Sequence, residues 1–309
     1  MSLFDIKEQF ATKQVDKWQY IDKMYEVHSM LFDYASFIKG TNISKIEIED
    51  GNVIMTFRDS GVKFICAAGD KRLAPFDALN FGGYEEEELS MQMALIGKYD
   101  VVFDIGANYG WYAAHMAKRF PEAKIFSFEP IPKTYESLQK NLSLNNIHNV
   151  TAVNIGMGEQ KDRFVFYYDP QLSVNASMSN LTNAASVEST VCEVSTLDHF
   201  SIERGLKVDF IKCDIEGAEL LAFKGGRALL ERDKPIIFSE MLRKWTAKFN
   251  YHPNDIIDFL KELGYTCFVI SEGKLMPFSR VDENTSETNY FFLHAEKHIG
   301  LIEKYSSKL

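Results

Sequence analysis

The chain has 309 residues, 46% of them hydrophobic and 25% charged, a composition that predicts a folded chain with a sizeable core. Lys and Arg total 34 against 44 Asp and Glu, giving a net charge of −10 at pH 7. This acidic balance argues against a surface that follows nucleic-acid phosphates, so we expect no nucleic-acid partner. No apolar run approaches the roughly 20 residues that span a bilayer, and the first residues lack the apolar stretch of a signal peptide. We therefore predict a cytoplasmic protein with no membrane span and with four buried, reduced cysteines.

The first 80 residues predict a small N-terminal α+β extension. Apolar residues between 1 and 40 follow a period close to 3.6, which predicts helix ending near Gly40. Residues 43–48 and 53–57 alternate between apolar and polar side chains on either side of a turn at 50–52, which predicts a hairpin. A third strand is expected at 62–66. The main domain is expected to cover residues 81–309.

Strands alternate with helices from residue 100 onwards. Strands are predicted at 100–105, 123–129, 150–155, 208–213, 235–240, 265–270 and 289–294, and helices at 111–120, after Pro132, from Glu216 and after Pro253. This order predicts an α/β, Rossmann-like fold with a seven-stranded, mostly parallel sheet and helices on both faces. The polar connection before the last strand shows no clear helix, which allows that strand to run antiparallel. An insertion at 162–195 holds two β-like runs around a stretch rich in Ser, Asn, Thr and Ala, which we interpret as a binding loop.

The first strand of the main domain ends in the sequence Asp104-Ile105-Gly106-Ala107-Asn108-Tyr109-Gly110. Glycines at the start of a helix allow a tight bend close to a ligand. Asn108 occupies the position of the second glycine in a dinucleotide fingerprint, and a side chain there argues against a pyrophosphate. Asp104 would repel phosphates but suits a cationic amino group. The alternative reading is a plain strand–helix turn.

A second acidic residue, Glu129, ends the next strand, 25 positions after Asp104. An acid at this place is positioned to accept hydrogen bonds from ribose hydroxyls, although it also suits a helix N-terminus. Together, Asp104, the two-glycine loop and Glu129 fit an adenosyl group that is joined to an amino acid and carries no phosphate. That compound is S-adenosylmethionine.

The same residues resemble a known family. The loop from Asp104 to Gly110, together with Phe128-Glu129-Pro130, Thr196-Leu197-Asp198 and Lys212-Cys213-Asp214-Ile215-Glu216-Gly217-Ala218-Glu219, is similar to the FkbM-type S-adenosylmethionine-dependent methyltransferases. The resemblance extends over about residues 84–240. It implies a class I methyltransferase fold and O-methylation of a hydroxyl on a sugar, a glycoconjugate precursor or another small natural product.

The resemblance also implies roles for particular residues. The methionine moiety is expected on Gly106, Ala107, Asn108, Tyr109 and Gly110, the ribose on Glu129 beside Pro130, and the adenine near Ile155, Gly156 and Met157. Tyr84 is expected near the cofactor, and Asp214 nearest the methyl group, unless it only caps the following helix.

A hydroxyl acceptor must also lose its proton to a base or to a metal-bound group. The candidate bases are Asp214, Glu216, Glu240 and His199. Asp214 with Glu216 could hold a divalent cation, but no third ligand is evident, so no metal site is predicted.

Two other functions stay open at this point, and so does the oligomeric state. One is an NAD- or nucleotide-sugar-dependent oxidoreductase, and the other is a module that binds S-adenosylmethionine without turnover. The aromatic-rich N-terminal helix either forms a homodimer, covers the site or packs on its own domain.

Overall fold

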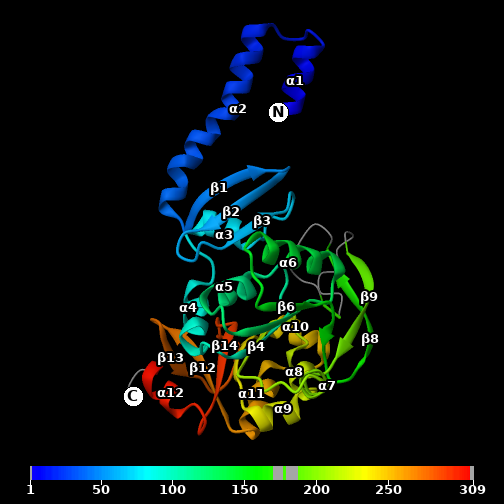
Figure 1. The fold of residues 1–309 in the computed structure, drawn as a ribbon, viewed down its shortest axis with the longest axis vertical. Coiled ribbons are helices and arrows are strands. Elements are labelled where there is room, and N and C mark those ends of the chain that lie inside the picture. The colour runs from blue at the N-terminus through cyan, green and yellow to red at the C-terminus, as the bar shows by residue number, and fades with distance from the viewer. Residues whose placement is uncertain (1, 170–176, 179–186, 307–309) are drawn as a thin grey trace.

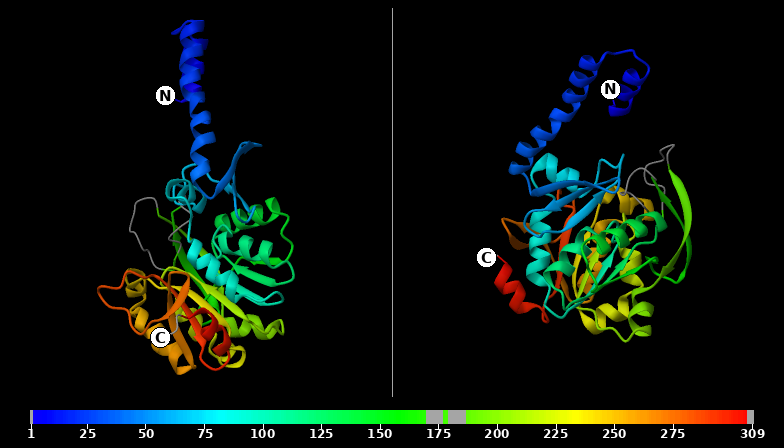
Figure 2. Two further views of the ribbon diagram at one scale, coloured as in Figure 1. Left: turned by 90° about the vertical axis from the view of Figure 1, so that its left-hand side faces the viewer. Right: turned by 45° about the horizontal axis from the view of Figure 1, so that its top comes forward.

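A computed structural model describes residues 2–169, 177–178 and 187–306. A large twisted sheet with helices on both faces forms the body of the molecule (Figure 1). A small sheet lies above the body, and a helical hairpin at the N-terminus projects away from both (Figures 1 and 2). A second small sheet flanks the body at one side.

Two helices, rather than one, precede the small upper sheet. They are α1 (Leu3–Ala11) and α2 (Lys17–Phe37), and α2 is followed by the 3₁₀ turn η1 (Ile38–Gly40). The predicted helical pattern is confirmed, but it breaks between the two helices, where Lys13 has a φ of 59°. The reason is a strong local start signal: the Asp16 carboxylate accepts from the N–H groups of Trp18 and Gln19, which caps α2.

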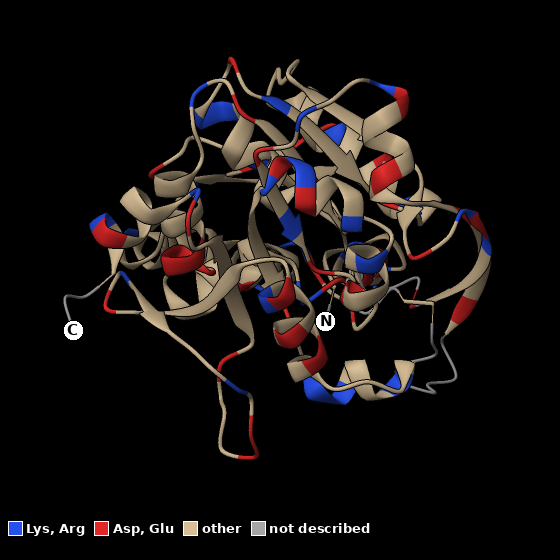
Figure 3. Cartoon of the chain, turned by 90° about the horizontal axis from the view of Figure 1, so that it is seen from below, with Lys and Arg blue, Asp and Glu red and all other residues tan. Residues whose placement is uncertain are grey.

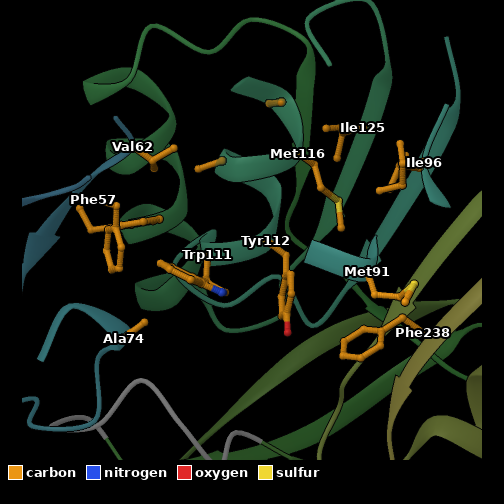
Figure 4. Packing of buried hydrophobic residues seen from close by; sticks show 14 of the residues in the cluster. Phe57, Val62, Ala74, Met91, Ile96, Trp111, Tyr112, Met116, Ile125 and Phe238 are labelled. Carbon is orange, nitrogen blue, oxygen red and sulfur yellow. The ribbon is translucent and has the colours of Figure 1, made fainter. Parts of the chain in front are cut away.

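The predicted hairpin and third strand are confirmed. Strands β1 (Ile43–Glu49), β2 (Asn52–Phe57) and β3 (Lys63–Cys66) form an antiparallel sheet. Phe57 and Phe64 from this sheet pack against Trp111 and His115 of the body, so the extension shares a hydrophobic core with the main sheet (Figure 4). Helices α3 (Ala74–Phe81) and α4 (Glu86–Leu95) connect the two parts. The division of the chain at residue 80 stays a prediction.

The main sheet has eight strands in the order β13-β12-β14-β11-β10-β4-β5-β6. Their bounds are β4 (Val101–Ile105), β5 (Lys124–Phe128), β6 (Val150–Val153), β10 (Phe210–Cys213), β11 (Ile236–Glu240), β12 (Tyr265–Ser271), β13 (Lys274–Pro277) and β14 (Asn289–His294). Strands β6, β5, β4, β10 and β11 are parallel, and β14 runs antiparallel to β11 and β12. This Rossmann-like arrangement confirms the predicted fold class, including the reversed last strand.

The predicted count of seven strands was wrong by one. The additional strand, β13, pairs with β12 through a two-residue turn at Glu272 and Gly273, whose φ values are 51° and 69°. Two successive positive φ values are typical of the tightest hairpin turns. With four residues, β13 is too short to produce a clear alternating pattern in the sequence.

Helices cover both faces of the sheet, and successive residues of each central strand face opposite cores. Val102 belongs to one hydrophobic cluster and Phe103 to the other. The helices of the body are α5 (Trp111–Arg119), α6 (Pro132–Leu144), α7 (Leu197–Glu203), α8 (Glu219–Lys224), α9 (Arg227–Asp233), α10 (Arg243–Thr246), the 3₁₀ turn η2 (Ala247–Phe249), α11 (Pro253–Glu262) and α12 (Ile299–Tyr305).

The helix expected from Glu216 begins later, at Glu219. Glu216 and Gly217 have φ values of 55° and 100°, so both belong to a turn. The Glu219 carboxylate accepts from the N–H groups of Ile215 and Gly217 and fixes that turn. Glu216 is thereby placed at the end of the sheet rather than on a helix.

The insertion forms a second small sheet with the order β7-β9-β8, made of β7 (Gly156–Met157), β8 (Asp162–Tyr168) and β9 (Glu188–Ser195). Its two β-like runs are confirmed. Residues 170–176 and 179–186 of the stretch that we interpret as a binding loop lie outside the described residues.

The apolar content of the helices and the distribution of charge limit the kinds of partner that the protein can have. Among the described residues, no helix is long and apolar enough to cross a membrane. Acidic and basic segments are interspersed over the body rather than gathered into one basic stripe (Figure 3).

Candidate active site at the carboxyl ends of the strands

A narrow cavity of about 70 Å³ lies where β4, β5 and β10 end. Ligands of open α/β sheets bind at this edge. The turns after β4, β5 and β10 supply most of the lining residues that the sequence analysis expected to contact a ligand. The lining comprises Ile105, Gly106, Asn108, Phe128, Glu129, Pro130, Gly156, Met157, Phe166, Met178, Asp214, Ile215, Glu216 and Ala218. None of these described residues is a Lys or an Arg, so no cationic side chain lines the cavity.

Gly106 marks the closest approach between the turns after β4 and β10. Its φ is 75°, and a Cβ atom added there would lie 1.9 Å from the carbonyl oxygen of Asp214. No larger residue fits this crossing. The N–H groups of Gly106 and Ala107 both donate to the carbonyl of Phe128, which ties the turn to β5.

Glu129 and Asn108 form the second part of the cavity wall. The Glu129 carboxylate accepts from the N–H groups of Asn108 and Ile131, each at 3.0 Å. Burial raises the pKa of Glu129 to about 7, against the effect of those two donors and of Lys212. The side-chain oxygen of Asn108 is buried and has no hydrogen-bond partner among the residues that the structure describes. A buried acceptor of this kind, in a cavity wall, suits a donor group of a ligand.

Lys212 lies between the turns and was not predicted from the sequence. Its ammonium group donates to the carbonyl of Gly106 at 2.7 Å and lies 3.5 Å from the Asp104 carboxylate and 3.6 Å from that of Asp214. Burial alone would lower the pKa of Lys212, but the two carboxylates outweigh it and raise that pKa. Lys212 therefore stays charged in the core and holds the turns after β4 and β10 together.

Asp104 lies inside the protein instead of in the cavity wall. It is fully buried, paired with Lys212, and 3.5 Å from the hydroxyl of Ser127. The sequence analysis expected Asp104 and Glu129 to face one shared cavity. In the structure Glu129 lines the cavity and Asp104 does not. Asp214, whose side chain is 34% exposed, is the strand-end aspartate that lines the cavity.

Three further carboxyl groups, those of Glu85, Glu216 and Glu240, gather beside Asp214. Burial raises the pKa of Glu240, and the neighbouring carboxylates of Asp214, Glu216 and Glu85 raise it further. Both effects favour the neutral form of Glu240. The predicted catalytic candidates Asp214, Glu216 and Glu240 are therefore brought together.

Glu85 completes this group, although the sequence analysis gave it no role. It precedes α4 with a φ of 46°, and its carboxylate accepts from the hydroxyl of Tyr112 at 2.5 Å. Burial raises the pKa of Glu85 to about 7. Its position depends on how α4 folds back on α5, and a run of four glutamates in the sequence gives no sign of which one turns inwards.

The other predicted residues have different places. His199 lies on the exposed start of α7, with its ring 3.2 Å from the ammonium of Lys161, and does not line the cavity. The Tyr109 hydroxyl accepts from the N–H of Ala74, and Gly110 lies against Leu138, so both face the core. Tyr84 packs edge-on against Trp111, near Glu85. Ile155 packs against the cluster that contains Phe103.

A metal site does not emerge from this acidic group. The part of the chain that the structure describes contains no set of three or more His, Cys, Asp or Glu side chains arranged to hold a metal ion.

Comparison with known proteins points to one family. Residues 104–267 match the family described as the methyltransferase FkbM domain. Methyltransferase 1 of Beauveria bassiana is 27% identical over 142 residues, which cover 40% of this chain and 57% of that protein. The 2-O-methyltransferase NoeI of Sinorhizobium fredii is 25% identical over 163 residues, 48% of this chain and 66% of that protein. The chain thus spans less than two thirds of the length of these relatives.

Among solved structures, the FkbM methyltransferase of Methylobacillus flagellatus KT is similar, with a TM-score of 0.44 and 19% identity. The match covers 71% of this chain and 53% of that one.

Replacing Lys212 by Met should destabilise the protein by about 3–5 kcal/mol at pH 8, because Asp104 is then left buried and charged without a partner. In this variant the pKa of Asp104 in the folded state rises further above its unfolded value. The folded state then binds the extra proton, so the variant should lose stability as the pH rises from 5 to 8. Urea unfolding at both pH values measures this. The matched control, Lys98→Met, breaks the exposed pair with Glu122 and should leave the free energy of unfolding almost unchanged. A Lys212 variant as stable as that control would contradict the role of Lys212.

Two glycine variants separate backbone strain from the close approach at the site. Gly106 and Gly51 have nearly the same φ, 75° and 77°, but a Cβ atom at Gly51 meets nothing within 4 Å. Gly51→Ala should therefore cost only the backbone strain, about 1–2 kcal/mol. Gly106→Ala should cost roughly a further 1–3 kcal/mol, because the Asp214 carbonyl must move. Equal losses of unfolding free energy in the two variants would show that the crossing at Gly106 is not tight.

Proposed function

The chain belongs to the FkbM methyltransferase family, and on this premise we propose that it transfers a methyl group from S-adenosylmethionine to a hydroxyl of a small acceptor. The observation that carries the proposal is the chemistry of the cavity wall. Glu129 and Asp214 both line it, and none of its described lining residues is cationic. Carboxylates without cations suit a ribose and a positively charged amino acid, and they oppose a pyrophosphate. This favours the methyltransferase over an NAD-dependent oxidoreductase.

Each part of the proposed cofactor has a matching group. Glu129 can accept from ribose hydroxyls with the lone pairs that Asn108 and Ile131 leave available. Gly156 and Met157 offer an apolar wall for the adenine. Asp214 is the group for the ammonium of the methionine moiety, in place of the buried Asp104. Its neighbours Glu85 and Glu216 strengthen the negative field at that end of the cavity.

When bound, the cofactor supplies an electrophilic methyl group on a positively charged sulfur. The chain then has to align the acceptor and remove a proton from it. We assign proton removal to Glu85, which lies next to the cavity-lining Asp214 and whose pKa of about 7 leaves it partly ionised at neutral pH. The raised pKa of Glu240 favours its neutral form, which makes it a poorer proton acceptor than Glu85. His199 is excluded as the proton acceptor, because it lies on α7 away from the cavity.

An oxygen acceptor is the finer part of the proposal. It rests on the acidic group next to the cavity, which is suited to take up a hydroxyl proton, and on the name of the relative NoeI, a 2-O-methyltransferase. We therefore propose a sugar or a similar hydroxylated small molecule as the acceptor. We also keep the predicted division of the chain at residue 80 and the cytoplasmic location as proposals.

Calorimetric titration with S-adenosylmethionine tests the cofactor. We expect binding that is up to about tenfold tighter at pH 8 than at pH 6, because the ribose needs the ionised form of Glu129, whose pKa is about 7. The unliganded fold shows the opposite trend: the pKa of Glu129 is raised on folding, so this group stabilises the fold below pH 7 and ceases to do so above it. Glu129→Gln should remove the dependence of affinity on pH. No binding at roughly 1 mM ligand would contradict the cofactor assignment.

Methyl transfer to a panel of sugars and other hydroxylated acceptors tests the role of Glu85. Glu85→Gln should lower kcat by about 10²–10⁴-fold, because the proton acceptor is lost, while the affinity for S-adenosylmethionine stays the same. His199→Gln is the matched control, since it removes a titratable group of α7 outside the cavity, and it should retain full activity. If the Glu85 variant kept wild-type kcat, another group would have to take the proton.

A further inference from the structure

The turn after β10 carries part of the cavity wall in a strained conformation. Asp214 and Glu216 line the cavity from this turn. Glu216 has a φ of 55°, in the left-handed region that disfavours residues with a side chain, and Gly217 follows with a φ of 100°. Backbone of this kind persists only where the surrounding structure enforces it. The turn therefore needs contacts that hold it on both sides.

The first half of the turn is held from the side of β4. The N–H of Asp214 donates to the carbonyl of Ile105 at 3.1 Å, and the Asp214 backbone packs against Gly106. These contacts fix the point where the chain leaves β10. The strained residues Glu216 and Gly217 come after that point, so they need partners of their own.

The second half of the turn is held by a glutamate and a tyrosine. One oxygen of the Glu219 carboxylate accepts from the N–H groups of Ile215 and Gly217, each at 3.0 Å. The hydroxyl of Tyr251 donates to the carbonyl of Gly217 at 2.7 Å and lies 3.2 Å from the other oxygen of Glu219. Gly217 is thus bound through both its N–H and its carbonyl, and Tyr251 supplies the second of these bonds.

Tyr251 comes from a different part of the chain. It lies between η2 and α11, 34 positions after Gly217. The same segment packs closely on the turn, because a Cβ atom added at Gly217 would lie 2.6 Å from the carbonyl carbon of Trp245. Gly217 is buried, so loss of the Tyr251 hydroxyl would leave its carbonyl without this donor inside the protein. That cost favours a rearrangement of the turn.

We propose that Tyr251 is a positioning residue of the site: its hydroxyl holds the turn after β10, so that Asp214 and Glu216 keep their places in the cavity wall. Tyr251 does not itself line the cavity, so it acts through the turn. The effect on the turn is independent of the reaction. The effect on a ligand rests on the proposed function, in which Asp214 binds the ammonium of S-adenosylmethionine.

Amide hydrogen exchange of the full chain tests the effect on the turn. Tyr251→Phe removes only the hydroxyl, and the N–H groups of Ile215 and Gly217 should then exchange about 3–10-fold faster, because the turn opens more easily. Tyr290→Phe is the matched control, since the hydroxyl of this buried tyrosine also donates to a backbone carbonyl, that of Glu287 at 2.8 Å. Urea unfolding of both variants corrects the rates for any change in global stability. Wild-type exchange of the two amides in the Tyr251 variant, or equal acceleration in the control, would overturn the proposal.

Calorimetric titration with S-adenosylmethionine tests the effect on the site. Tyr251→Phe should weaken binding by about 3–10-fold, whereas Tyr290→Phe should bind as the wild type does. In an Asp214→Asn background, Tyr251→Phe should have little further effect, because the group that it positions is already lost. Losses of affinity that add up in the double variant would contradict a role through Asp214.

The dependence of affinity on pH separates positioning from general damage to the cavity. Glu129 lies on a different turn, so binding to the Tyr251→Phe variant should still tighten from pH 6 to pH 8 as in the wild type. Loss of this dependence in the variant would show that the whole cavity is disturbed and would overturn the positioning role. A wild type that binds no S-adenosylmethionine would contradict the proposed function instead, and amide exchange would still decide the role of Tyr251.

Discussion

The buried ammonium group of Lys212 is the interaction on which the arrangement of this site depends. It lies between two strand-end aspartates and also binds the backbone carbonyl of Gly106. An unpaired charge at this depth would be far too costly, so the two carboxylates and the carbonyl must be in place before the sheet is stable. The same contacts fix the bend after β4 relative to the bend after β10. Stability of the core and geometry of the site are therefore set by one group.

The separation of the two aspartates explains the electrostatics of the cavity. Asp104 neutralises Lys212 inside the protein. Asp214 therefore faces outwards, and its side chain is partly exposed to solvent. The carboxylates of Glu85 and Glu216 then add their negative charge to that of Asp214. The result is a negative field at one end of a cavity whose other end is a buried glutamate and an apolar wall. Such a gradient orients a ligand that is cationic at one end and neutral at the other.

Much of the fold could be predicted from the sequence, because strands and helices of the body alternate with clear periods. The rule that ligands bind where parallel strands end also brought Gly106, Glu129 and Asp214 to one cavity. The rule could not separate Asp104 from Asp214, since both are strand-end carboxylates and only the position of Lys212 decides which is buried. Glu85 and His199 show the same limit: the first reaches the site through the packing of α4, and the second leaves it because α7 starts on another side. A pattern along the chain does not contain these three-dimensional facts.

The reversed direction of β14 has a further consequence. After a parallel strand, the segment that follows the strand reaches the site. Because β14 is antiparallel, the segment that precedes it reaches the site instead. There, the N–H of Met241, just after β11, donates to the carbonyl of Thr288. Residues 278–288 therefore form an arm that is joined to the site at one end and to the edge of the sheet at the other. Because none of its residues lines the cavity, such an arm can change in length or composition without moving the three turns around Gly106, Glu129 and Asp214. A longer or shorter arm would instead reshape the surface beside the end of β11.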